Sequence, residues 1–125
     1  MAQTFTDDEL TYLRSQRLGR LATVDGTGAP QNNPVGFVVD NGTGHVIIGG
    51  RAMGTTRKFR NVKANPHVAL VVDDIASVHP WVVRGVEIRG TAAALSDVDS
   101  PIQGTSREVI RITPQRIISW GVGTA

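Results

Sequence analysis

The sequence of 125 residues contains no cysteine, and this absence excludes several kinds of chemistry. Disulfides, thiolate zinc sites and cysteine nucleophiles all need the missing side chain. Aromatic residues make up only 5% of the chain. The three histidines, His45, His67 and His79, are scattered, and no two of them have metal-ligand spacing on one face. We therefore predict no metal site, and the sequence identifies no catalytic side chain.

Long apolar runs are also missing, since the longest pure stretch in the middle of the chain covers residues 68–72. A membrane-spanning helix needs roughly 20 such residues. The N-terminus carries Asp7, Asp8 and Glu9 and lacks the apolar segment of a signal peptide. A net charge of +2 is too small for a general nucleic-acid binder. We expect a cytoplasmic protein with neither a membrane nor a nucleic acid as its partner.

Short β-rich segments account for most of the chain. We expect strands at residues 18–24, 31–39, 45–49, 67–73, 81–95, 108–113 and 116–120, the last two hinged at Pro114. A helix should run from the capping box of Thr6 and Glu9 to about Gln16. A second should run from Thr55 or Thr56 to Asn65, before a proline. The pattern predicts a mainly β fold with about six strands and two short helices, an antiparallel barrel or sandwich in a single domain, 1–125.

Glycine and proline positions refine this expectation. Pro30 and Pro34 limit the second strand to an edge or a bulge, because proline has no N–H to donate. Gly85 and Gly90 suggest bulges or bends in the long strand 81–95. The adjacent acids at 73 and 74 are interpreted as part of a turn.

A basic segment is the most informative feature of the chain. Residues 51–63 hold five of the thirteen cations and no acid. Arg57 and Lys58 fall in the first turn of the expected helix, where the helix dipole is already positive. A bound anion explains this placement, received by free N–H groups and a flexible glycine loop. We infer a phosphate-bearing ligand; the alternative is a solvated basic helix. The loop is not a Walker A motif, because Thr55 replaces the lysine.

Three stretches of the sequence follow one another in a characteristic order and spacing. They are residues 18–24 with 28–31, Thr56-Arg57-Lys58 followed by Asn65-Pro66, and residues 84–92 followed by 112–121. On these motifs the chain, from about residue 5 to residue 122, resembles the pyridoxamine 5′-phosphate oxidase-like split-barrel flavoproteins. Within this family the chain looks most like the actinobacterial deazaflavin-dependent oxidoreductases, which use coenzyme F420. The resemblance implies a split antiparallel β-barrel of the FMN-binding type.

The resemblance also implies a homodimer with its cofactor sites at the subunit interface. By position, Arg57 and Lys58 would hold the cofactor phosphate, and Trp120 would lie near the ring system. Residues 31–35 would run beside the ring, and residues 48–49 would approach the ribityl chain. The cofactor-binding residues predicted in this way are Gln31, Asn32, Asn33, Pro34, Val35, Ile48, Gly49, Arg51, Thr56, Arg57, Lys58 and Trp120.

The chain departs from the oxidases of this family in two respects. A glutamine cofactor contact near Gly85 is missing, and the C-terminal basic residues for the substrate phosphate have no clear match, so the vitamin B6 oxidase reaction is not expected. Arg51 and Arg60 are surplus for FMN but suit the longer anionic tail of F420. The first hypothesis is therefore an F420-dependent oxidoreductase that transfers hydride to or from a small electron-poor substrate. An FMN-binding reductase or oxidase, or a non-catalytic flavin- or deazaflavin-binding protein, are the alternatives.

Overall fold

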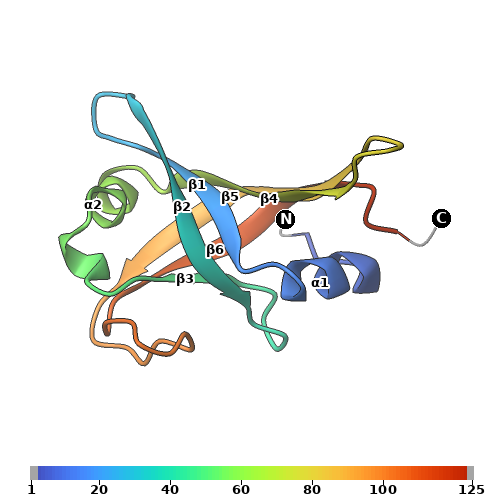
Figure 1. The fold of residues 1–125 in the computed structure, drawn as a ribbon. Coiled ribbons are helices and arrows are strands. Elements are labelled where there is room, and N and C mark those ends of the chain that lie inside the picture. The colour runs from blue at the N-terminus through green and yellow to red at the C-terminus, as the bar shows by residue number, and fades with distance from the viewer. Residues whose placement is uncertain (1–2, 124–125) are drawn as a thin grey trace.

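A closed antiparallel barrel forms the centre of the protein (Figure 1). The structure is a computed structural model that describes residues 3–123. The strand order is β1-β2-β3-β6-β5-β4. The elements are α1 (Asp7–Arg14), β1 (Leu18–Val24), β2 (Pro30–Val39), β3 (Val46–Gly49), the 3₁₀ turn η1 (Met53–Thr55), α2 (Arg57–Ala64), β4 (His67–Ser77), β5 (Val82–Leu95) and β6 (Val109–Trp120). The prediction of a mainly β split barrel with two short helices is confirmed.

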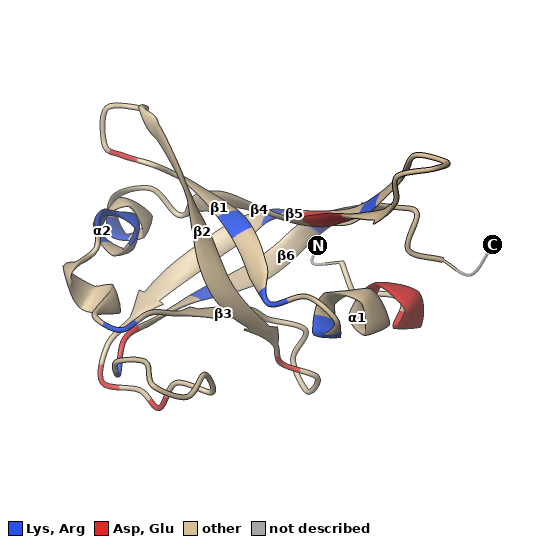
Figure 2. Ribbon diagram, viewed as in Figure 1, with Lys and Arg blue, Asp and Glu red and all other residues tan. Residues whose placement is uncertain are grey.

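The two helices lie at opposite ends of the barrel (Figure 1). The capping box predicted for α1 is present: Thr6 Oγ1 accepts from the Glu9 N–H, and the Glu9 carboxylate accepts from the Thr6 N–H. The helix ends at Arg14, two residues before the predicted end. Acids occupy its first turn and Arg14 its last, as the helix dipole favours (Figure 2). Within residues 3–123, no helix is long and apolar enough to cross a membrane.

Inward-facing strand residues fill the barrel, as the period of two in β-strands requires. Leu70, Ile88 and Ile112 are fully buried members of one hydrophobic cluster. Leu13 of α1 and Phe59 of α2 belong to the same cluster, so each helix is anchored to the barrel through apolar packing. This anchoring fixes where the first turn of α2 stands.

Strand β2 changes partners half-way along its length. Residues 30–36 pair with β1, whereas residues 36–39 pair with β3. The backbone of residues 30–35 therefore has a strand on one side only. Pro30 and Pro34 both fall in this half, which confirms the prediction of an edge.

The predicted hinge at Pro114 is wrong, because β6 is continuous from Val109 to Trp120. Pro114 stays in the strand because the pairing register shifts beside it: Gly90 pairs with Pro114, whereas Arg89 pairs with Arg116. The predicted irregularity at Gly90 is therefore present, but the extra residue, Gln115, lies on β6. A Cβ atom at Gly90 would lie 2.1 Å from the Thr113 carbonyl oxygen, so only glycine fits there.

Three other local predictions are corrected along the β4–β5 hairpin. The acids Asp73 and Asp74 lie within β4, which extends to Ser77, and not in a turn. Gly85 is not a bulge, since it pairs in register with Asp73 on one side and Trp120 on the other. Strand β5 begins at Val82, so Trp81 lies in the turn before it.

Candidate functional site

The first turn of α2 presents two backbone donors that have no partner in the described part of the chain. Thr56 caps the helix: its hydroxyl accepts from the Phe59 N–H at 3.3 Å and donates to the Met53 carbonyl at 2.7 Å. Among residues 3–123, no partner is found for the N–H groups of Arg57 and Lys58. Such orphan donors at a helix N-terminus form a natural anion site.

Positive charge gathers around these donors, as Figure 2 shows for α2. The first turn contains no acid, and the side chain of Arg57 is exposed while that of Lys58 is half-buried. Asp25, in the turn between β1 and β2, is an acid whose pKa is affected by the charge of Arg57. Hydrogen bonds from Thr27 and Ala29 are the main causes that lower the pKa of Asp25, and the charge of Arg57 adds to them. Arg57 and Lys58 thus outnumber the single carboxylate of Asp25.

Asn61 ties α2 to the strands beside it. Its side chain is only 5% exposed, and its Nδ2 donates to Thr23 Oγ1 at 3.0 Å and to Gln31 Oε1 at 3.3 Å. The Gln31 amide is thereby oriented by a residue of the candidate anion helix. The sequence did not reveal Asn61, because its partners lie 38 and 30 residues away.

The glycine-containing segment before α2 is not the free loop that the sequence suggested. The Met53 N–H donates to Ser106 Oγ at 3.1 Å, and the Gly54 N–H donates to Glu108 Oε1 at 3.1 Å. Both partners belong to the loop of residues 96–108 that joins β5 to β6. The prediction of a flexible loop with free N–H groups is therefore wrong at Met53 and Gly54.

Gly49 is packed against the same loop. A Cβ atom there would lie 3.2 Å from both Ile102 Cδ1 and Ser100 Oγ. Its lack of a side chain is thus explained by packing, and contact with a ribityl chain remains a prediction.

The residues predicted beside a ring system lie on the half of β2 that has one free edge. Gln31 and Asn33 are half-buried, whereas Asn32 and Pro34 are exposed. Val35 and Ile48 are buried in the core, so only their backbone could meet a ligand. Arg51 is exposed in the turn before η1.

Within a single chain, Trp120 lies far from α2. It pairs with Gly85, and a Cβ at Gly85 would lie 2.5 Å from Trp120 Cζ2, so the indole lies over the glycine. Gly85 in turn pairs with Asp73, and β4 covers about 20 Å between His67, just after α2, and Asp73. The indole is 38% exposed at the far end of the barrel.

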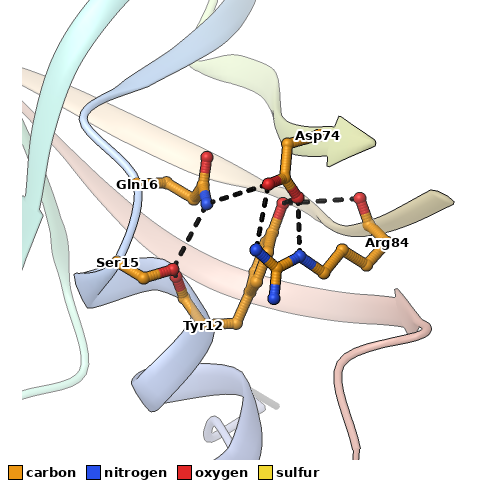
Figure 3. A network of polar contacts seen from close by, with 5 residues as sticks. All are labelled: Tyr12, Ser15, Gln16, Asp74 and Arg84. Atoms are coloured by element: carbon orange, nitrogen blue, oxygen red, sulfur yellow. Dashed lines mark hydrogen bonds and ion pairs between the residues drawn. The ribbon is translucent and has the colours of Figure 1, made fainter. Parts of the chain in front are cut away.

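A polar network fixes α1 near this far end (Figure 3). Asp74 accepts from the Tyr12 hydroxyl at 2.9 Å and from Arg84 Nε and Nη2 at 2.8 and 3.0 Å. The Arg84 hydrogen bond is the main cause that lowers the pKa of Asp74. Burial, followed by the bond to Asp74, raises the pKa of Tyr12. The tyrosine is therefore held neutral as a donor.

Two of the larger cavities lie over the second half of β2. One, of about 420 Å³, is lined by the end of α1, residues 36–39 and Ile102. The other, of about 500 Å³, lies beside it over Val38 and Ile47. The lining of the first cavity begins at Gly36, the residue that follows the predicted cofactor strip of residues 31–35.

Sequence comparison matches residues 5–121 to the family model described as pyridoxamine 5′-phosphate oxidase. The chain belongs to this family. A reductase of 5a,11a-dehydrotetracycline and 5a,11a-dehydrooxytetracycline from Streptomyces rimosus subsp. rimosus is 51% identical over 124 residues, which cover 94% of this chain and 84% of that protein. These matches confirm the predicted membership of an oxidoreductase family.

Similar solved structures agree with the fold. HupZ of Group A Streptococcus is similar with a TM-score of 0.75 and 18% identity, covering 97% of this chain and 98% of that one. A structure described as an F420 reductase has a TM-score of 0.61 and 26% identity, covering 82% and 90%. The first likeness shows the fold alone, and the second adds a deazaflavin enzyme to the relatives.

Proposed function

We propose that this protein is an F420-dependent reductase that reduces an activated double bond of a small, electron-poor organic substrate. The observation that carries the proposal is the pair of unused N–H groups at Arg57 and Lys58, beside two cationic side chains. These residues fit a phosphate, because backbone donors and positive charge converge there. The similarity to a dehydrotetracycline reductase and to an F420 reductase supports this choice.

A bound reduced deazaflavin would supply the hydride. Arg57 and Lys58 would bind its phosphate, and Asn61 would orient the Gln31 amide on the strip beside the ring. The chain's task is to position the reactants and to exclude water. We assign no side chain as proton donor, and solvent would supply the proton.

FMN is the alternative cofactor, because the family is a flavoprotein family. Arg51 is exposed before η1, and Arg60 is exposed on α2. Both would be surplus for a terminal monophosphate and useful for the phosphodiester and glutamate carboxylates of F420. This surplus supports F420 over FMN.

The position of Trp120 favours a homodimer. Suppose that the indole contacts the ring of a cofactor whose phosphate lies at α2. One chain cannot then supply both the phosphate site and the Trp120 contact, because a ribityl chain does not span about 20 Å. A second copy can bring its own Trp120 to the site. Exposed apolar residues near this end, Ile75, Val78, Trp81 and Val82, are consistent with a covered surface.

Titration of the purified protein with FMN and with F420 tests the cofactor. We expect F420 to bind more tightly, and reduced F420 to be oxidised when an electron-poor alkene is added, followed by its absorbance. Tight FMN binding without F420 binding would reverse the order. Binding of either without turnover of any acceptor would favour the non-catalytic alternative.

Mixed dimers test the shared site. Lys58→Ala and Trp120→Ala homodimers should each be impaired, whereas a mixed dimer contains one site with both lesions and one with neither. We expect unfolding and refolding of the two variants together to restore activity beyond that of either alone. No recovery from a dimer shown to be mixed would contradict a site built from two copies.

A further inference from the structure

Ser106 and Glu108 hold the segment that leads into α2. The Ser106 N–H donates to the Gly50 carbonyl at 2.9 Å, and its Oγ accepts from the Met53 N–H at 3.1 Å. The Ser106 hydroxyl lies 3.2 Å from the Gly50 oxygen and 2.9 Å from Glu108 Oε1, but it has one proton to donate. Because the Glu108 carboxylate is the closer and the stronger acceptor, that proton goes to Glu108, which also accepts from the Gly54 N–H.

The contact between Glu108 and Gly54 is close. A Cβ atom at Gly54 would lie 2.9 Å from both Glu108 Cδ and Oε1. The two hydrogen-bonded pairs join residues 53 and 54 positions apart, so they depend on the folded barrel. The loop of residues 96–108 and the turn η1 thus form one unit.

The charge of Glu108 is unfavourable for an anion at α2. Gly54 precedes Arg57 by three residues, so the two lie within roughly 11 Å of each other. That distance is comparable with the Debye length of about 8 Å at physiological salt. A carboxylate here repels a phosphate bound at the first turn, so its presence requires a compensating geometric benefit.

We infer that Ser106 and Glu108 are positioning residues for the anion site, a role that rests on the proposed cofactor binding at α2. Their hydrogen bonds fix η1 and thereby the direction of the Arg57 and Lys58 N–H groups. The carboxylate charge opposes the ligand, while its hydrogen-bond geometry favours binding. The charge of Glu108 and its hydrogen bonds therefore have opposite effects on ligand affinity.

Two substitutions separate these effects. Glu108→Gln keeps an oxygen that accepts from Gly54 and Ser106 but removes the charge, so FMN or F420 should bind as tightly as to the wild type or up to about threefold more tightly. Glu108→Ala and Ser106→Ala should bind about tenfold more weakly. The control is Asp99→Ala in the same loop, whose side chain is 94% exposed and pairs with Arg107; it should leave the Kd unchanged.

The measurements are Kd values from fluorescence titration and amide hydrogen exchange of the ligand-free proteins. The Met53 and Gly54 amides should exchange faster in Glu108→Ala and remain protected in Glu108→Gln. Equal tightening by both Glu108 variants would show a charge effect alone and overturn the inference, as would an unchanged Kd in Glu108→Ala or an equal loss in Asp99→Ala. If Glu108→Ala does not fold, Ser106→Ala decides by the same criteria. A wild type that binds neither cofactor refutes the proposed function itself, whereas binding without the Glu108 effect refutes only this inference.

Discussion

Removing the two cations of the first turn of α2 is the most direct perturbation of the proposed site. Arg57→Ala and Lys58→Ala each delete a charge-assisted hydrogen bond to the cofactor phosphate. Such bonds contribute about 1.5–3 kcal/mol when shielded. The Arg57 side chain is exposed and that of Lys58 half-buried, so solvent screening reduces the expected loss to about 1–2 kcal/mol each. That loss weakens binding by about 5- to 30-fold for each variant.

The double variant should lose about 2–4 kcal/mol if the two side chains act independently. The backbone N–H groups remain in it, so residual binding is expected. Fluorescence titration of FMN and F420 at about 0.1 M and 1 M salt provides the measurement. The wild type should lose affinity at high salt more than the double variant, because the deleted charges no longer contribute.

Lys63→Ala is the matched control, since Lys63 lies in the last turn of the same helix and its ammonium stands over the Phe59 ring at 4.9 Å. Its affinity for the cofactor should stay close to that of the wild type. An unchanged Kd in the double variant would refute the phosphate assignment. An equal loss of affinity in Lys63→Ala would indicate a general electrostatic effect of the helix and no specific site in its first turn.

Other predictions follow from the packing around the site and at the far end of the barrel. Asn61→Ala should lower the free energy of unfolding in urea by about 1–3 kcal/mol, because the buried Thr23 hydroxyl and the half-buried Gln31 amide lose their partner; an effect under about 0.5 kcal/mol would contradict this. Gly85→Ala should cost about 1–3 kcal/mol by overpacking against Trp120, and adding Trp120→Ala should recover part of that loss; full additivity would argue against the contact. Asp74 has a lowered pKa in the fold, so its stabilisation is present above its unfolded value near pH 4 and is lost as the pH falls through the folded pKa. Thermal unfolding of Asp74→Asn should therefore approach that of the wild type below about pH 4, and a constant gap at all pH values would refute the ion pair with Arg84.

Short-range features of the fold were predictable from the sequence. The capping box of Thr6 and Glu9 lies within four consecutive residues, so its formation does not depend on distant parts of the chain. The edge position of Pro30 and Pro34 follows from the missing N–H of proline. These predictions needed no knowledge of what lies across the barrel.

Features that depend on distant partners were not predictable. The continuity of β6 through Pro114 depends on a register shift opposite Arg89 and Gly90 of the neighbouring strand. Asp74 was taken for a turn residue because its partners, Tyr12 and Arg84, come from α1 and β5. The contacts of Ser106 with the turn before α2 join positions more than fifty residues apart, and no local pattern marks them.

The half-paired stretch of β2 has a consequence for solubility. An open strand edge with regular donors and acceptors invites another extended chain to add to it, which is a common start of aggregation. Pro30 and Pro34 lack the N–H such an addition would use, so this edge stays accessible to small molecules while resisting other strands. The two prolines that interrupt the β pattern thus keep this free edge of β2 from becoming a site of fibril growth.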